Sequence, residues 1–170
     1  MKDKSKIFLC VVSCLLGFSI VLFFFDYVKL TLSVGGSSES TTMSGFDAMF
    51  GFSETYEGTK TKVCNFSFVA LSPLILSIVA LVLVFLRYYK PKFNTTIFKA
   101  ITAVVLLATV ILIFVMPSVV NFTDEYQKVL DLIEVFGNSY NLTLAPCGVL
   151  SAIGFIGATG VTVADIFISK

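Results

Sequence analysis

FSFVALSPLILSIVALVLVFL, residues 66–86, is a run of 21 residues that contains no charged side chain. At a rise of about 1.5 Å per helical residue, such a run crosses the ~30 Å hydrocarbon core of a bilayer. Three further apolar stretches of similar length lie at residues 7–25, 97–120 and 144–168. The sequence therefore predicts a multi-pass membrane protein with four spans.

The composition supports this prediction and narrows the chemistry. Hydrophobic residues make up 56% of the 170-residue chain and charged residues only 14%, whereas soluble domains carry about a quarter charged residues. Histidine is absent, which removes the usual acid/base group at neutral pH and the commonest metal ligand. No pairing of a nucleophile with a base is visible either. We expect a non-enzymatic protein without a cofactor, metal site or nucleic-acid partner.

Basic residues near the span ends predict the orientation, because Lys and Arg collect on the cytoplasmic side. With the N-terminus inside, eight basic residues face two acidic ones there: Lys2, Lys4, Lys6, Arg87, Lys90, Lys92, Lys99 and Lys170 against Asp3 and Asp165. The outer segments hold four basic and nine acidic residues: Lys29, Lys60, Lys62 and Lys128, with Asp26, Glu39, Asp47, Glu54, Glu57, Asp124, Glu125, Asp131 and Glu134. We expect both termini to be cytoplasmic and the membrane to be the plasma membrane.

The first apolar stretch also has features of a signal peptide, since lysines precede it. Its 19 residues are long for a signal sequence, and no cleavage site of small residues follows. Cys14 ends a segment that loosely resembles a lipidation motif, but residues 15–25 continue the apolar run. A retained first helix is therefore favoured over cleavage or lipidation.

The first outer loop, residues 26–65, contains two segments of strand-like alternation. Residues 28–34 alternate apolar and polar side chains, and Gly35 and Gly36 then interrupt the pattern. Residues 62–68 alternate more loosely. We expect these two segments to pair antiparallel as a small extracellular element resembling a β-hairpin.

A short surface helix is predicted between the two strand-like segments. Ser44 and Asp47 have capping-box spacing, and Gly51 follows as a stop signal. Phe46, Met49 and Phe50 fall on one helical face. This face either rests on the bilayer and caps the loop, or contacts a partner or lipid directly.

The second outer loop, residues 121–143, is acidic and contains another predicted helix. The pattern begins at Thr123 and ends at Gly137. We expect Val129, Leu130, Ile133 and Phe136 to share one face. The helix either extends the third span or folds over the strands of the first loop.

Cysteines and acidic residues near the spans offer few candidate sites. Cys64 and Cys147 both adjoin the outer boundary, where a disulfide between them is one possibility and two thiols the other. Cys10 and Cys14 lie one helical turn apart and are interpreted as small packing residues. Asp26 and Asp165 lie near span ends and are interpreted as membrane-interface residues.

Small residues in the fourth span predict close helix packing. Several recur four residues apart, which lets helix backbones approach within the bilayer. The set comprises Gly148, Ala152, Gly154, Gly157, Ala158, Gly160 and Ala164. They cover more than one face, which indicates contact with two neighbouring helices within the chain, with homodimerisation as the alternative.

The predicted fold is all-α in the membrane: one four-transmembrane-helix bundle spanning residues 1–170, with the small β-element and surface helices outside. This arrangement resembles the claudin-type tetraspan architecture. The shared features are four spans, both ends inside, a long first outer loop with strands and a short second loop. The resemblance covers the whole chain at the level of topology and implies a barrier or junction function. Claudins carry a Trp and paired cysteines in the first loop. Here Trp is absent and Cys64 is the single loop cysteine, so no residue role is carried over.

The leading functional hypothesis is an integral membrane scaffold or accessory protein. It would act through protein or lipid contacts of its first outer loop, with membrane lipids and another membrane protein, or a second copy of itself, as partners. The alternative is a small transporter or a subunit of an oligomeric channel.

Overall fold

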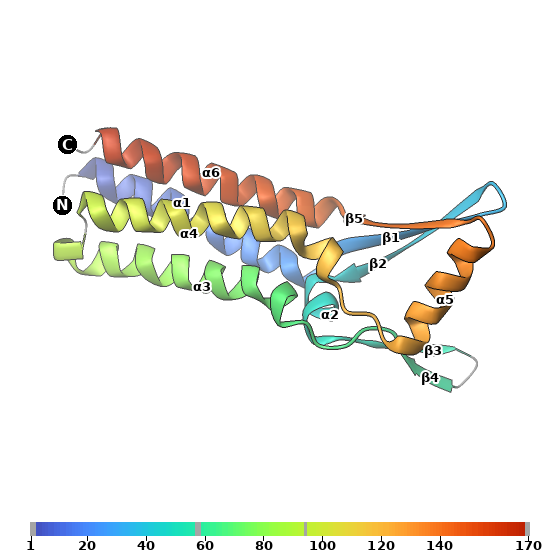
Figure 1. The fold of residues 1–170 in the computed structure, drawn as a ribbon. Helices are drawn as coiled ribbons and strands as arrows, with labels where there is room; N and C mark the ends of the chain where they lie inside the picture. Colours follow the sequence, from blue (N-terminus) through green and yellow to red (C-terminus); the bar gives the residue numbers. More distant parts are fainter. Residues whose placement is uncertain (1–2, 57–58, 94, 169–170) are drawn as a thin grey trace. The chain divides into compact units, whose positions relative to one another are not determined.

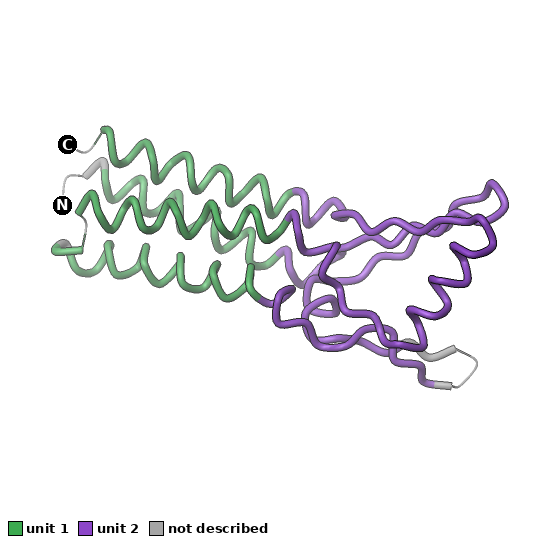
Figure 2. Tube along the Cα trace, in the orientation of Figure 1, with its two compact units in different colours: residues 1–21, 72–113, 150–170 green, residues 22–71, 114–149 purple. Residues whose placement is uncertain are grey.

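The computed structural model describes residues 3–56, 59–93 and 95–168. The chain forms two compact units, which Figure 2 shows in different colours. Unit 1 comprises Met1–Val21, Ser72–Ile113 and Leu150–Lys170, and unit 2 comprises Leu22–Leu71 and Phe114–Val149. Three charges used in the orientation argument, Lys2, Glu57 and Lys170, lie outside the described residues.

Unit 1 is helical and contains most of each predicted span (Figure 1). Among the described residues, four helical segments are long and apolar enough to cross a membrane: Ser5–Phe24, Phe68–Tyr89, Thr96–Val119 and Pro146–Ile168. The first segment consists of α1 (Asp3–Val21) and η1 (Leu22–Phe24), and the second is α3 (Phe68–Tyr89). The third consists of α4 (Thr96–Val115) and η3 (Met116–Val119), and the fourth is α6 (Pro146–Ile168). A short turn, η2 (Pro91–Phe93), lies between α3 and α4. These segments indicate a multi-pass membrane protein.

In unit 1, several buried hydroxyl groups are hydrogen-bonded and many large apolar side chains are exposed, as expected for helices in an apolar surrounding. The buried hydroxyls of Ser77, Thr102 and Thr162 each donate a hydrogen bond to the carbonyl one helical turn earlier, at 2.6, 2.7 and 2.8 Å. Val104 and Phe167 are 66% and 69% exposed. Large apolar side chains exposed over the whole length of the helices suit hydrocarbon rather than water.

α6 packs closely against α1 through the small residues that the sequence indicates. A Cβ atom on Gly154 would overlap the hydroxyl of Ser19, and one on Gly157 would lie 3.5 Å from Leu15. The hydroxyl of Ser151 donates a hydrogen bond to the carbonyl of Ser19 at 3.1 Å. Gly160, by contrast, is exposed and has open space beside it. The small residues of α6 therefore divide into a packed set and an exposed one.

Unit 2 contains a three-stranded antiparallel sheet in the order β2-β1-β5. The strands are β1 (Asp26–Val34), β2 (Ser37–Ser44) and β5 (Ser139–Leu144). Gly35 and Gly36 form the turn between β1 and β2 with positive φ angles of 57° and 86°, which glycine adopts without steric cost. The predicted strand at residues 28–34 is therefore confirmed as the central strand β1.

The predicted partner of that strand is wrong. Residues 62–68 do not pair with β1, because its two edges are occupied by β2, with Ser33 opposite Ser38, and by β5, with Leu30 opposite Leu142. A separate two-stranded sheet instead joins β3 (Ser53–Tyr56) to β4 (Thr59–Lys62). Further along, Cys64 forms an isolated antiparallel bridge with Phe122.

Both predicted surface helices form with the expected caps. Helix α2 (Gly45–Phe50) begins at the capping box of Ser44 and Asp47 and ends at Gly51, whose φ is 82°. Helix α5 (Asp124–Val135) begins at Thr123, whose hydroxyl accepts a hydrogen bond from the backbone N–H of Tyr126 at 3.4 Å. The capping residues in the sequence therefore predicted where α2 and α5 begin.

Helix α5 connects the two sheets of unit 2. At its beginning, the hydroxyl of Thr123 donates a hydrogen bond to the carbonyl of Lys62, next to β3–β4, at 2.8 Å. Just beyond its end, the side-chain oxygen of Asn138 accepts a hydrogen bond from the backbone N–H of Gly35 in the β1–β2 turn, at 3.1 Å. The helix is thus separate from the third span and contacts the first loop at its two ends.

A leucine in place of Gly154 tests the α1–α6 packing. Gly154→Leu is expected to destabilise the protein by about 1–3 kcal/mol, because its side chain would displace Ser19 in a close-packed contact. Gly160→Leu is the matched control and should have little effect, since its side chain would enter open space. Unfolding in mixed detergent micelles measures both. Equal stability of the two variants would contradict the packing described.

Candidate functional site

Three ionisable side chains from three helices meet in unit 1. The guanidinium Nη2 of Arg87, near the end of α3, lies 2.6 Å from Oδ2 of Asp165 on α6. The Nζ of Lys99, near the start of α4, lies 3.1 Å from the other carboxylate oxygen, Oδ1. This ammonium also donates a hydrogen bond to the backbone carbonyl of Asp165 at 3.1 Å. We call these three residues the ion-pair cluster.

The ion-pair cluster is buried by protein. Arg87 and Asp165 are each 1% exposed and Lys99 is 5% exposed. Burying a charge costs several kcal/mol unless an opposite charge and hydrogen bonds compensate, and here one carboxylate faces two cations. The cluster therefore links α3, α4 and α6 through contacts that an apolar surrounding strengthens.

Asp165 lies near the end of α6, and its side chain is buried and paired, which the interpretation as an interface residue did not include. Its side chain is directed among the helices because α3 and α4 each present a cation at the same depth. The signal was present in the sequence: Lys99 and Asp165 both lie within predicted spans, where ionisable residues usually have partners. Asp26, in contrast, is exposed at the start of β1.

The ion-pair cluster is a set of contacts between side chains of three helices. Its acid is held by two cations, and it contains no hydroxyl or thiol nucleophile. Among the residues that the structure describes, no group of three His, Cys, Asp or Glu side chains could hold a metal ion. The contacts in the cluster stabilise the fold of unit 1.

A row of neighbouring aromatic rings, two pairs stacked and one tilted, runs through the first-loop part of unit 2. Phe24 stacks on Phe46 with ring centroids 4.3 Å apart, Phe46 lies 5.6 Å from Phe50, and Phe50 lies 6.1 Å from Phe66. Phe24, Phe50 and Phe66 are each about half exposed. Since Phe24 ends one span and Phe66 shortly precedes another, this aromatic row adjoins the points where the chain enters the spans.

The predicted contact face of α2 is only partly available. Phe46 and Phe50 belong to the aromatic row, but Met49 is fully buried in the core of unit 2. It lies beside the start of α3, where the backbone N–H of Ser67 donates to the carbonyl of Met49 at 2.9 Å. Met49 is therefore a core residue and not a surface contact.

Helix α5 presents apolar side chains on its exposed side. Leu130 is buried and Ile133 half-buried, whereas Val129 and Phe136 are 51% and 77% exposed, so the four residues expected to share one face divide between two sides. The exposed side holds four apolar residues that lie within one third of a helical turn, and we call them the α5 face: Val129, Leu132, Val135 and Phe136. The exposed carboxylates of Asp131 and Glu134 lie along one edge of it, and the exposed Lys128 lies within the same third of a turn. The α5 face was not singled out from the sequence.

The four cysteines, all within the described part of the chain, form no disulfide. Cys64 is buried, and its backbone is held in the bridge with Phe122. Cys147 is half-buried in the first turn of α6, which follows β5. Cys64 and Cys147 are both thiols in this structure. Cys10 and Cys14 are exposed, so they are not the buried packing residues expected.

No protein-family model matches the sequence, and a search of curated proteins finds no match. The four candidate spans and the small sheet are compatible with a tetraspan protein. Neither comparison supports the claudin-type resemblance.

Removing the carboxylate tests the ion-pair cluster. Asp165→Asn is expected to lower the free energy of unfolding by about 3–5 kcal/mol, because it leaves two buried cations without their counter-charge. Asp131→Asn is the control, since this exposed residue should contribute less than about 1 kcal/mol. Unfolding in mixed micelles again provides the measurement. Similar losses for both variants would show that the cluster does not stabilise unit 1.

Proposed function

We propose that the protein is a non-enzymatic membrane scaffold or accessory protein that binds a partner protein through unit 2. Its spans would form a four-helix bundle with both termini in the cytoplasm and unit 2 on the outer side of the plasma membrane. The basic residues at the α3–α4 link, Lys90 and Lys92, and the acidic residues of α5 support this orientation. The claudin-like architecture, and with it a junction function, is part of the proposal.

The α5 face is the observation that carries this proposal. A contiguous row of large apolar side chains that is exposed and bordered along one edge by carboxylates is typical of a protein-binding surface. Its C-terminal end adjoins the β1–β2 turn through the Asn138–Gly35 hydrogen bond. That turn lies at the end of the sheet opposite Asp26 and Leu144, where the chain leaves one span and enters another.

The partner is expected to combine apolar and basic side chains. Apolar groups would cover Leu132 and Phe136, and Lys or Arg residues would face Asp131 and Glu134. The aromatic row would contribute differently, by holding the first loop at the membrane surface. The two surfaces of unit 2 thus have separate proposed roles.

The buried ion-pair cluster is the observation in favour of the alternative, a small transporter or channel subunit, since ionisable side chains inside spans often belong to ion pathways. In this chain the carboxylate of Asp165 is occupied by Arg87 and Lys99. A solute pathway would require those contacts to open. Ion or solute flux through the reconstituted protein would support this alternative over the scaffold.

Site-specific photocrosslinking in native membranes tests the scaffold proposal. A photoreactive residue at position 136 is expected to capture one predominant protein, because Phe136 is 77% exposed on the α5 face. The same residue at position 50, in the aromatic row, is the matched control and should capture mainly lipid. Raising the salt concentration before irradiation should reduce capture at position 136, since the carboxylates beside the α5 face are screened.

Two results would contradict the scaffold proposal. One is the absence of a protein adduct at position 136 above the level found at position 50. The other is an adduct whose captured peptide carries no basic residue. Either result would leave the α5 face without the partner that its chemistry indicates.

A further inference from the structure

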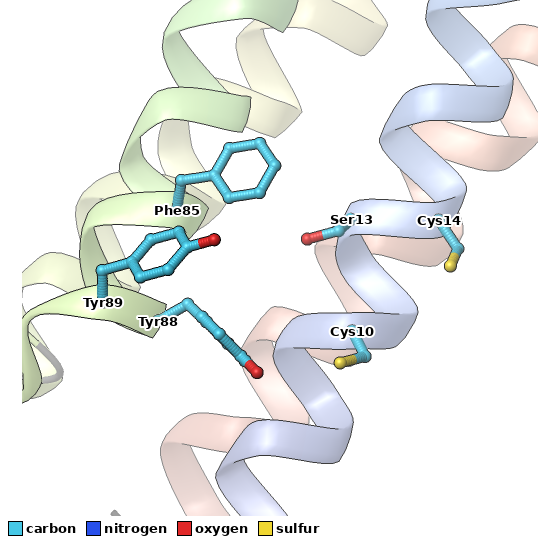
Figure 3. Close-up of a pocket in the computed structure, with 6 residues that line it drawn as sticks. All are labelled: Cys10, Ser13, Cys14, Phe85, Tyr88 and Tyr89. Carbon is cyan, nitrogen blue, oxygen red and sulfur yellow. The ribbon is translucent and has the colours of Figure 1, made fainter.

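A groove lies between α1 and α3 in unit 1. Its walls are Cys10, Ser13 and Cys14 on α1 and the aromatic side chains of Phe85, Tyr88 and Tyr89 on α3, around a volume of about 220 Å³. Figure 3 shows the aromatic rings on one side and the side chains of Cys10 and Ser13 directed toward them from the other. The groove lies inside two of the four candidate spans.

The rings of the groove support one another. Tyr88 and Tyr89 meet edge to face with centroids 5.3 Å apart, and Phe85 lies 6.4 Å from Tyr89 in a stacked arrangement. Rings that pack together in this way keep their positions, so the apolar wall exists before a ligand binds. In Figure 3 the hydroxyl of Tyr89 points toward Ser13 and that of Tyr88 toward Cys10, which places hydrogen-bonding groups along a mainly apolar wall.

A second, cationic hollow shares Tyr89 with the first. It measures about 490 Å³ and is lined by Tyr89, Lys90, Lys92 and Phe93. Phe93 is held edge to face against Phe98 with centroids 4.9 Å apart, and its backbone N–H donates to the carbonyl of Lys90 at 2.9 Å. These contacts fix the turn that carries the two exposed lysines.

An apolar region next to a cationic one matches the acyl chain and the anionic headgroup of a phospholipid. The apolar slot lies within the spans, a tyrosine ends α3, and two cations lie just beyond it. Tyrosine prefers the level of the lipid headgroups, and lysines at that level attract anionic lipids. A neutral lipid would use the slot but not the lysines.

We propose that the α1–α3 groove binds one anionic phospholipid. Its acyl chain lies against Phe85 and Tyr88, and its phosphate lies between Lys90 and Lys92. Tyr89 separates the two parts and contacts both. The site is independent of the proposed scaffold function, because it involves unit 1 alone.

The absence of tryptophan from this chain makes a direct binding assay possible. Phe85→Trp places a single fluorophore in the groove, and Val104→Trp places one on an exposed part of α4 as the control. Each protein is reconstituted in vesicles of phosphatidylcholine mixed with phosphatidylglycerol, one of the two lipids carrying bromine in its chains as the quencher. At position 85, the anionic lipid is expected to quench roughly tenfold to thirtyfold more effectively per molecule than the neutral lipid. At position 104, the two lipids should quench equally.

Substitution of the lysines provides the second measurement. Lys90→Gln with Lys92→Gln should remove the preference for anionic lipid at position 85, whereas Lys128→Gln, in unit 2, should leave it intact. Native mass spectrometry of the protein without the Trp substitution should show one retained phosphatidylglycerol. Its retention should also fall in Tyr89→Ala, whose side chain is 74% exposed and outside the core.

Three outcomes would overturn the proposal. The first is equal quenching by both lipids at position 85, and the second is a preference that persists without the two lysines. The third is complete loss of the preference when inorganic phosphate is added at millimolar concentration, because the lysines would then bind free phosphate rather than a lipid.

Discussion

The helical unit depends most on the ion pairs that the carboxylate of Asp165 forms with Arg87 and Lys99. In an apolar surrounding every charge needs a partner, and this carboxylate pairs with Arg87 of α3 and Lys99 of α4 at 2.6 and 3.1 Å. Elsewhere in unit 1, the hydroxyls of Ser77 and Thr162 bond to their own helix, the hydroxyl of Ser151 bonds to α1, and glycine allows α6 to approach α1. The ion-pair cluster joins three helices through contacts between charged side chains.

Unit 2 depends on a different constraint, the pairing of β5 with β1. This pairing joins residues more than 100 positions apart in the sequence, such as Leu30 and Leu142. The bridge between Cys64 and Phe122, and the bond from Thr123 to Lys62, join the same two loops a second time. The loops that follow spans 1 and 3 therefore form one folded unit, which positions the α5 face and the aromatic row on a common scaffold.

The sequence allowed the spans, the α2 capping box and the α5 cap to be predicted, because each depends on local composition or spacing. It also identified β1, whose alternation reflects one buried face. The partner strands were missed for two reasons. Strand β2 is almost wholly exposed and rich in Ser and Thr, so it has no alternation to detect. Strand β5 does alternate, with Tyr140, Leu142 and Leu144 more buried than their neighbours, but pairing over such a distance is not encoded locally.

The ion-pair cluster and the α5 face could not be derived from local patterns for a related reason. Arg87 and Lys99 indicate which side of the membrane their segments face, but their positions in the sequence do not show where the side chains point. Likewise, Val129 and Leu130 look equivalent in sequence, yet the fold buries one and exposes the other. Both features depend on how elements distant in the sequence pack together.

The central claim is that four membrane crossings place both long loops on one side, where they fold together. Single cysteines introduced at the exposed positions 41, 92 and 125, with the native cysteines replaced by alanine, test it through labelling with a membrane-impermeant maleimide in intact cells. The account predicts that positions 41 and 125 are labelled from the same side and position 92 only after the membrane is permeabilised. Labelling of positions 41 and 125 from opposite sides would contradict it, because β1 and β5 could then not pair.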